Sequence, residues 1–274
     1  MSAIKLTTRA IEKVWGRREL GLGFADPAPD GAPVGEIWFE AADEEAPELL
    51  VKYLFTSEKL SVQVHPDDAQ ARERGHPRGK EECWVILEAE SGARIGLGLV
   101  EPMDAETLRS AALDGSVEDR LDWKPVAPGD VFYLPAGTVH AIGAGVTLLE
   151  VQQNIDLTYR LYDYGRPREL HLDDAVAVAR AEPWQAPAAP GPISPGRDVI
   201  AAGRKFVIER WTGTVERSLS ASPDRPRWLI PLDGAGRIGD DPLEPGSVWL
   251  AKSDAELRHS GTIFIAYPGG AVAE

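Results

Sequence analysis

The sequence predicts a mainly β protein with two consecutive β barrels or sandwiches, and three observations support this fold class. Short apolar runs recur along the chain and alternate with Gly- and Pro-rich turns. Helical periodicity is confined to a few short segments. A Pro-rich stretch at 183–196 separates a larger first part, residues 1–182, from a smaller second part, residues 197–274. Many short strands with few helices are typical of closed or double-layered antiparallel sheets.

The first part opens with turn-rich sequence up to about residue 50 and then shows clear strand signals. The strands predicted from its apolar runs are 51–55, 59–65, 82–87, 131–134, 139–142, 146–153 and 158–162. Asp67-Asp68 and Asp104 are suitable helix caps. The short helices predicted from caps and periodicity are 68–75, 105–112, 117–121 and 172–181.

The stretch 183–196 is predicted to be a linker. Five of its fourteen residues are proline, so it cannot continue a helix or a central strand. Only strand and turn signals follow it, at 205–211, 227–232, 247–250 and 262–267.

A weak internal repeat connects the two parts. The run Pro128-to-Leu134 (PGDVFYL) is echoed by Pro245-to-Ala251 (PGSVWLA). The first copy continues to His140, whereas the second runs into Ser253-to-His259, which has no matching polar cluster. We therefore expect two related barrels, of which only the first keeps a site; chance similarity of two Pro-Gly turns is the alternative.

Composition limits the classes of function. The 274-residue chain has a formal net charge of −15, which argues against binding to nucleic acid or to anionic membrane surfaces. A local group of Lys and Arg can still hold one phosphate. The chain shows no apolar run of about 20 residues and no secretory signal, and Cys83 is its only cysteine. We expect a cytoplasmic protein without a thiolate zinc cluster; the sequence does not indicate its oligomeric state.

One predicted strand has a polar face that suggests a metal site. Its period of two places Ser61, Gln63 and His65 on one face and two valines on the other. Residues that face the interior of a barrel converge. The candidate metal ligands are Gln63, His65, Glu82 and His140. Imidazole and carboxylate ligands suit zinc, and also iron or manganese.

Each candidate also has an ordinary interpretation. A lone histidine on a strand is usually a surface residue or a satisfied polar one, and His76, His171 and His259 are assigned to that class. Glu82 follows another glutamate and could be solvated, but its place at the start of an apolar strand favours the interior.

A second polar row follows His140. Glu150, Gln152 and Asn154 share one face of their strand, and Arg160 lies in the next apolar strand. An arginine there either faces solvent or lies in a cleft with an anion or a carboxylate. Lys80 points to the same side as Glu82 if the strand begins there.

Four motifs in this order resemble those of type I mannose-6-phosphate isomerases, in their compact bacterial form. They are LSVQVHPDD at 60–68, GKEECW at 79–84, LPAGTVHAIG at 134–143 and DLTYRLYD at 156–163. The resemblance covers roughly residues 5–170. It implies a cupin (jelly-roll) barrel with short helices, followed by a smaller, degenerate cupin-like β domain.

The resemblance also implies residue roles. One zinc ion per chain would be held by Gln63, His65, Glu82 and His140. Arg160 matches the family's active-site arginine, and Glu150 and Lys80 match an acidic residue and a lysine of the site. Apart from the resemblance, the position of Ser61 on the same strand face as Gln63 and His65 would let it hydrogen-bond the phosphate or a hydroxyl group of the substrate. The expected reaction interconverts mannose 6-phosphate and fructose 6-phosphate through an enediol.

Two departures keep alternatives open. From about Val199 onward no motif matches closely, and the segment after Gln153 differs in detail from relatives, which bears on substrate preference. The alternatives are another metal-dependent cupin enzyme, such as an iron or manganese isomerase or a dioxygenase, and a non-catalytic cupin that binds sugar phosphates.

Overall fold

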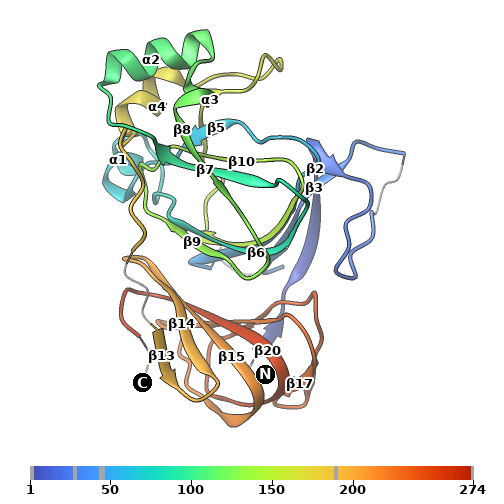
Figure 1. The fold of residues 1–274 in the computed structure, drawn as a ribbon. Coiled ribbons are helices and arrows are strands. Elements are labelled where there is room, and N and C mark those ends of the chain that lie inside the picture. Colours follow the sequence, from blue (N-terminus) through green and yellow to red (C-terminus); the bar gives the residue numbers. More distant parts are fainter. Residues whose placement is uncertain (1–2, 27–29, 43–46, 188–190, 273–274) are drawn as a thin grey trace.

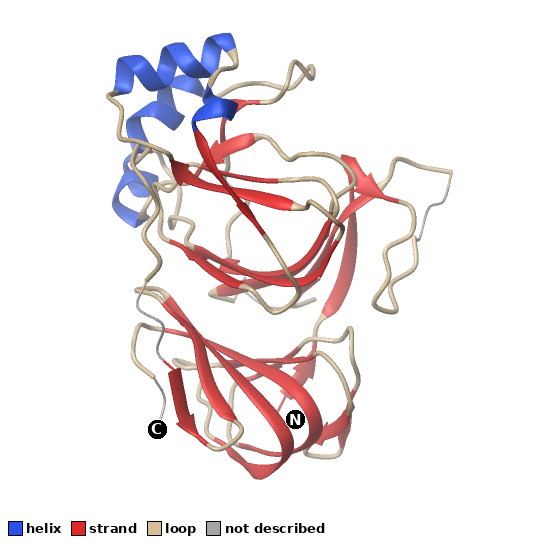
Figure 2. Ribbon diagram, viewed as in Figure 1, coloured by secondary structure: helices blue, strands red, loops and turns tan. Residues whose placement is uncertain are grey.

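The computed structural model describes residues 3–26, 30–42, 47–187 and 191–272. Its secondary structure is mainly β, as the sequence predicts, and the strands form three sheets (Figures 1 and 2). The helices are α1 (Asp68–Glu73), α2 (Ala105–Asp114), α3 (Val117–Arg120) and α4 (Leu172–Val178). No helix in this described part of the chain is long and apolar enough to cross a membrane.

Two sheets face each other and form the first barrel. The six-stranded sheet has the order β2 (Thr7–Arg17), β3 (Val34–Glu40), β4 (Leu49–Phe55), β11 (Val146–Gln153), β6 (Glu82–Ala89) and β9 (Val131–Leu134). The five-stranded sheet has the order β12 (Tyr159–Tyr162), β5 (Val62–Val64), β10 (His140–Ile142), β7 (Arg94–Leu99) and β8 (Leu121–Pro125).

The third sheet contains the C-terminal strands and lies on the other side of the six-stranded sheet (Figure 1). Its main path is β1 (Ala3–Lys5), β19 (Trp249–Ala251), β16 (Arg227–Pro231), β20 (Ala255–Pro268), β15 (Phe206–Leu219), β14 (Arg197–Ala202) and β13 (Gly191–Ser194). The short strands β17 (Ala235–Ile238) and β18 (Asp241–Leu243) extend it through β20.

The alternation of side chains along β11 shows how the layers are separated. Leu148 faces the core inside the first barrel, with Trp84 and Ile86 of β6. Leu149 points the other way, into a core shared by the six-stranded and nine-stranded sheets. A third core lies between the five-stranded sheet and the helices, and a fourth lies within the nine-stranded sheet. The barrel interior is therefore the place where polar side chains can form a site.

Local sequence accounts for the helix ends. Asp67 accepts hydrogen bonds from the first amides of α1, and Gln70 completes a capping box. The Asp104 side chain accepts from the amide of Thr107 at the start of α2, and Gly115 ends that helix with a φ of 85°. All four predicted helices are present, and α1 and α4 end earlier than predicted.

The division between the first and second parts of the chain differs from the prediction in two places. Strand β1, inside the predicted first part, pairs with β19 through Ala3 and Ala251. Residues 191–194, inside the predicted linker, form β13. Proline is accepted there because β13 is an edge strand, which leaves one row of backbone groups unpaired. Residues 188–190 of the linker lie outside the described residues.

Candidate active site and metal centre

Three side chains inside the first barrel could hold a metal ion together. Ligand atoms of His65, Glu82 and His140 lie within 4.8 Å of one another, and all three residues are buried. One Glu82 oxygen is 3.4 Å from His65 Nε2, and the other is 3.3 Å from His140 Nε2. Two imidazoles and a carboxylate around a common point form a suitable donor set for zinc.

The two sheets of the barrel supply these ligands from opposite sides. In the five-stranded sheet, Gln63 of β5 lies directly opposite His140 of β10 and Arg160 of β12. His65 follows β5 by one residue. Glu82 starts β6 in the six-stranded sheet, opposite Gln152 of β11. Residues far apart in the sequence are thus brought together by strand register.

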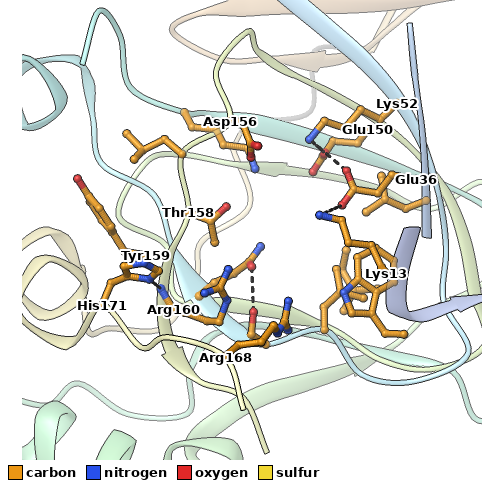
Figure 3. A pocket seen from close by; sticks show the side chains of 18 of the residues that line it. Lys13, Glu36, Lys52, Glu150, Asp156, Thr158, Tyr159, Arg160, Arg168 and His171 are labelled. Carbon is orange, nitrogen blue, oxygen red and sulfur yellow. Dashed lines mark hydrogen bonds and ion pairs between the residues drawn. The ribbon is translucent and has the colours of Figure 1, made fainter. Parts of the chain in front are cut away.

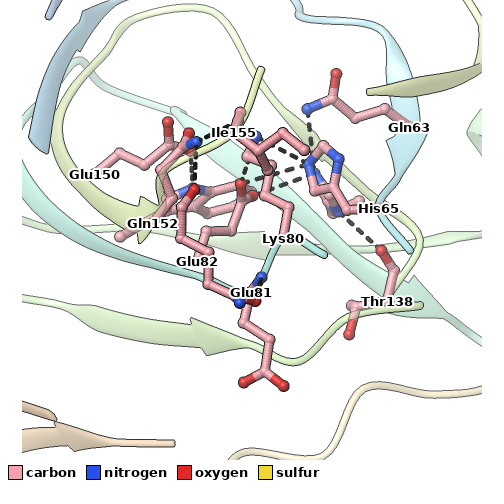
Figure 4. Close-up of polar contacts among 12 residues, drawn as sticks. Gln63, His65, Lys80, Glu81, Glu82, Thr138, Glu150, Gln152 and Ile155 are labelled. Atoms are coloured by element: carbon pink, nitrogen blue, oxygen red, sulfur yellow. Dashed lines mark hydrogen bonds and ion pairs between the residues drawn. The ribbon is translucent and has the colours of Figure 1, made fainter. Parts of the chain in front are cut away.

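Gln63 is next to the three ligands. Its Nε2 points toward the cluster (Figure 4) and lies 3.2 Å from His140 Nε2. Its Oε1 lies 3.2 Å from the Ser61 hydroxyl. The orientation of an amide is an assignment, and a flip exchanges its oxygen and nitrogen. The flipped amide would direct its oxygen to the ligand cluster and its nitrogen to Ser61, so Gln63 could serve as a fourth ligand.

The histidines are in the neutral form that binds metals. Burial and the nearby Lys80 ammonium together lower the pKa of His65 to about 3. Burial also lowers the pKa of His140. His140 Nδ1 lies 2.8 Å from the carbonyl oxygen of Thr138, to which it can donate. That hydrogen bond leaves Nε2 as the acceptor nitrogen, directed toward Glu82.

Glu82 is an ionised carboxylate with unsatisfied oxygens. Burial alone would raise its pKa, but Lys80 and the two imidazoles hold that pKa well below its usual range. Lys80 Nζ lies 2.9 Å from Glu82 and 3.2 Å from His65 Nε2. Neither Glu82 oxygen accepts a hydrogen bond of regular geometry from the described residues. The Lys80 ammonium lies against Glu82 and His65, so this group of side chains attracts positive charge. The same side chains could bind a divalent cation.

A row of charged and aromatic side chains crosses the six-stranded sheet beside this cluster. Lys52 of β4 lies opposite Trp38 on one side and Glu150 on the other, and Glu150 lies opposite Trp84. Lys52 Nζ is 3.2 Å from Glu150, and the Trp84 indole donates to Glu150 at 3.1 Å. Glu36 is 3.7 Å from Lys52.

Glu150 has the environment of a proton-transfer group. Burial raises the pKa of its carboxyl, and the attraction of Lys52 opposes this only in part. A carboxyl with a raised pKa accepts and returns protons at near-neutral pH more readily than an ordinary one.

A cavity of about 490 Å³ connects these groups. The cationic side chains that line it are Lys13, Lys52, Lys80, Arg160 and Arg168 (Figure 3). Four of the five pair with carboxylates, at Glu36, Glu150, Glu82 and Asp163. Arg160 is the exception among the described residues: it donates to the carbonyl oxygen of Glu169 at 2.7 Å and its Nε has no partner. The cavity therefore offers one cation for an anionic ligand.

Proteins of similar sequence and structure identify the family of this chain. The mannose-6-phosphate isomerase of Streptococcus mutans is 34% identical over 257 residues, which cover 83% of this chain and 80% of that protein. The chain belongs to the mannose-6-phosphate isomerase family. Mannose-6-phosphate isomerase ManA of Bacillus subtilis is 41% identical over 162 residues, covering 54% of this chain and 51% of the relative.

Structural similarity extends over the whole mannose-6-phosphate isomerase fold. The crystal structure of mannose 6-phosphate isomerase from Bacillus subtilis matches with a TM-score of 0.82 and 27% identity, over 97% of this chain and 99% of that chain. Because the match covers nearly the whole chain, the similarity to the Bacillus subtilis structure includes the C-terminal sheet, for which the sequence offered no motif. No family model matches the chain.

In this member of the mannose-6-phosphate isomerase family, all the predicted site residues lie in or next to one cavity. Ser61, Gln63, Lys80, Glu150 and Arg160 line it, and the three clustered ligands lie next to Lys80 and Gln63. His76 and His171 also line it, which was not predicted. His171 is a satisfied polar residue, because its Nδ1 accepts from the amide of Arg160 at 3.2 Å.

Lys13, Glu36 and Lys52 also line the cavity and were not predicted. Lys52 stands in the middle of the apolar run LLVKYLF and is 4% exposed. This is the same signal that singled out Arg160, so it could have been found. Glu36 stands in the similar apolar run VGEIWFE, whereas Lys13 lies in the largely exposed strand β2 and carries no such signal.

Proposed function

We propose that this chain interconverts mannose 6-phosphate and fructose 6-phosphate and uses one zinc ion held by His65, Glu82, His140 and Gln63. The observation that carries the proposal is the cluster of two neutral imidazoles and an ionised carboxylate beside a cavity with one unpaired arginine. Membership of the family supports the same reaction. The substrate is a small sugar phosphate, and we expect the protein to act in the cytoplasm.

The isomerisation needs a proton to be removed from the carbon beside the carbonyl and returned to the neighbouring carbon. A bound divalent ion would supply Lewis-acid polarisation of the sugar oxygens. Glu150 is the best candidate for the proton transfer, because it lines the cavity and its pKa is raised. Lys52, at 3.2 Å, would hold the ionised form in place between the two transfers.

Arg160 is assigned to the negative charge of the substrate. It is the cavity-lining cation without a carboxylate partner among the described residues, so a phosphate or the developing enediolate oxygen would meet an uncompensated guanidinium. Ser61 would hydrogen-bond a hydroxyl or phosphate oxygen of the substrate, because among the described residues its hydroxyl contacts Gln63 alone.

Lys80 has a supporting role in this proposal. Its ammonium is buried and lies between Glu82 and His65, so it would balance the charge of Glu82 and orient it toward the metal. Direct proton transfer is assigned to Glu150, which has no contact with the ligand cluster at ion-pair distance.

The decisive experiment is an isomerase assay of purified protein with a panel of hexose phosphates, with bound metal measured in the same preparation. We expect turnover of mannose 6-phosphate and about one zinc ion per chain. His140→Ala is expected to lose both metal and activity, because one of three clustered ligands is gone. His76→Ala, a cavity residue outside the cluster, should keep the metal. A metal-loaded protein that binds hexose phosphates without turnover would refute the catalytic proposal.

A further inference from the structure

The nine-stranded sheet holds a cluster of charged and aromatic side chains that local sequence patterns do not predict. A hollow of about 150 Å³ opens there, and it shares no lining residue with the cavity of the first barrel. Four strands contribute charged or aromatic side chains to it. They are Arg197 of β14, Glu209, Trp211 and Arg217 of β15, Arg227 of β16 and Tyr267 of β20.

Glu209 at the base of this hollow is already fully satisfied. Its side chain is 1% exposed, and Arg197 binds both of its oxygens, at 2.6 and 2.9 Å. The Trp211 indole donates to it at 2.7 Å, and the Tyr267 hydroxyl donates at 2.6 Å. One carboxylate is thus neutralised by one guanidinium, and further arginines around it are in excess.

Arg227 is the first of these excess cations. It is 5% exposed and forms no ion pair within the described part of the chain. Its guanidinium lies 4.5 Å from the centroid of the Tyr267 ring, and Nη1 donates to the carbonyl oxygen of Arg225 at 3.0 Å. A buried cation without an anionic partner is costly, and cation–π contact offsets only part of that cost.

Arg217 is the second, and it lies at the exposed side of the hollow. It lies 5.1 Å from the centroid of the Trp211 ring and makes no hydrogen bond or ion pair with any described residue. Stacking on the indole orients the guanidinium, and its N–H donors remain available at the edge of the ring plane.

The charge balance of the hollow is opposite to that of the protein. Three lining guanidiniums and one carboxylate give 3 − 1 = +2, in a chain whose formal net charge is −15. Ser218 and Ser220 add hydroxyl groups to its lining. A positive hollow in an acidic protein concentrates small anions locally.

We propose that this hollow binds a small phosphorylated anion, with Arg227 and Arg217 donating to the phosphate oxygens. A tetrahedral dianion matches the excess charge of +2, and arginine forks bind phosphate oxygens in pairs. The site would be a second anion site in the C-terminal sheet, separate from the catalytic cavity and independent of the reaction proposed there.

Calorimetric titration with inorganic phosphate at low ionic strength tests this. The titration is made on the full chain carrying Arg160→Ala, so that the unpaired cation of the first cavity is absent. We expect one phosphate per chain, bound about tenfold more weakly after Arg217→Gln is added, since a charge-assisted hydrogen bond is lost. Arg237→Gln, which removes an exposed arginine of the same sheet, is expected to leave the affinity unchanged.

The expected losses must be specific to the hollow. Arg217 is exposed, so we expect Arg217→Gln to leave the fold intact. Arg227 is buried, so the thermal unfolding transition of Arg227→Gln is measured to verify that this second variant is folded. Tighter binding of glycerol 3-phosphate than of inorganic phosphate would identify a phosphorylated metabolite as the ligand, and equal binding would identify phosphate itself. Affinity unaffected by Arg217→Gln and Arg227→Gln, or lowered equally by Arg237→Gln, would overturn the proposal.

Discussion

Glu150 shows how one buried residue acquires chemistry from its neighbours. It is 4% exposed, and Lys52 and the Trp84 indole contact its two oxygens. Full burial would make its carboxyl hard to ionise, whereas Lys52 keeps the ionised form accessible. The position of Lys52 directly opposite in β4, with Lys80 also nearby, therefore favours the charged form of Glu150.

Glu150→Gln is expected to lower kcat by about 10²- to 10⁴-fold, because a positioned acid/base is lost while the shape is kept. Bound metal should not change. In the unsubstituted protein, activity should fall as the pH decreases through the raised pKa of Glu150, because only the ionised carboxylate accepts a proton. Steady-state kinetics across pH measures both effects. Glu88→Gln on the exposed side of β6 is the control, and equal losses in the two variants would contradict the assignment.

Arg160→Ala is expected to lower kcat/KM by about 10- to 100-fold. Arg160 is the cavity cation without a carboxylate partner among the described residues, and the variant can no longer meet the substrate's negative charge with it. Metal content should stay the same, since Arg160 does not contact the clustered ligands. Arg160→Lys should recover part of the loss. Arg120→Ala, on the exposed α3, provides the comparison. Full activity of Arg160→Ala would show that the anion is bound elsewhere.

At the scale of elements, the C-terminal part is hydrogen-bonded to the segment that carries Glu82, one of the proposed metal ligands. Lys205 donates to Asp68 of α1 at 2.6 Å, and Asp68 accepts from the amide of Gly79 at 2.8 Å and from Gln153 at 3.0 Å. Gln153 in turn accepts from the amide of Glu81 at 3.0 Å. These bonds position residues 79–81, immediately before Glu82.

Asp68→Asn is expected to lower the free energy of unfolding at pH 7 by about 1 kcal/mol, a value reduced for partial exposure. Burial opposes ionisation of Asp68, but hydrogen bonds from Lys205 and Gln153 lower its pKa to about 2, against 3.8 ordinarily. Because the pKa of Asp68 is lower in the folded state, its charge stabilises the fold at pH values above the pKa of the unfolded chain. This stabilisation is lost as the pH falls toward about 2. Denaturant unfolding at several pH values measures this.

The difference between Asp68→Asn and the unsubstituted protein should therefore disappear near pH 2. Asp119→Asn on the exposed surface of α3 should show no comparable difference at pH 7. A pH-independent loss for Asp68→Asn would mean that packing of the carboxamide, and not the charge of Asp68, is responsible.

At the scale of the whole molecule, the two β units share a core. Phe206 and Trp228 of the nine-stranded sheet pack with Tyr53 and Leu149 of the six-stranded sheet. The Phe206 ring centroid is 5.0 Å from that of Tyr133. Gly203 lies so close to Tyr133 that an added Cβ would be 1.7 Å from its Cζ. The units therefore stabilise each other, although the linker suggested separate domains.

Phe206→Ala is expected to lower the free energy of unfolding by about 3–5 kcal/mol, the range for deleting a buried aromatic side chain. Because the core is shared, both units should unfold in one transition at a lower temperature. Ile193→Ala, at an exposed position of β13, should have little effect. Calorimetry, combined with release of bound metal as a probe of the first barrel, shows whether the two units unfold in one transition or in two. A shift confined to one of two transitions would show that the units are independent.

Local pattern was sufficient to predict the β class, most strand positions after residue 50, the four helices and the polar face of Gln63 and His65. Alternation and caps act over a few residues, so a linear sequence contains them. Strand β2 falls in the segment described as turn-rich, because much of it is exposed and lacks apolar alternation. The ligand roles came from four motifs, and spacing alone left Glu82 and Arg160 undecided.

Tertiary structure decided which side chains meet. The row Lys52–Glu150–Trp84 depends on the register of β4, β11 and β6, which no local pattern specifies. The return of β1 to β19, the shared core and the arginine-lined hollow around Glu209 likewise join segments that are distant in sequence. Such contacts are set by long-range pairing and burial of the whole chain, so the sequence read locally could not provide them.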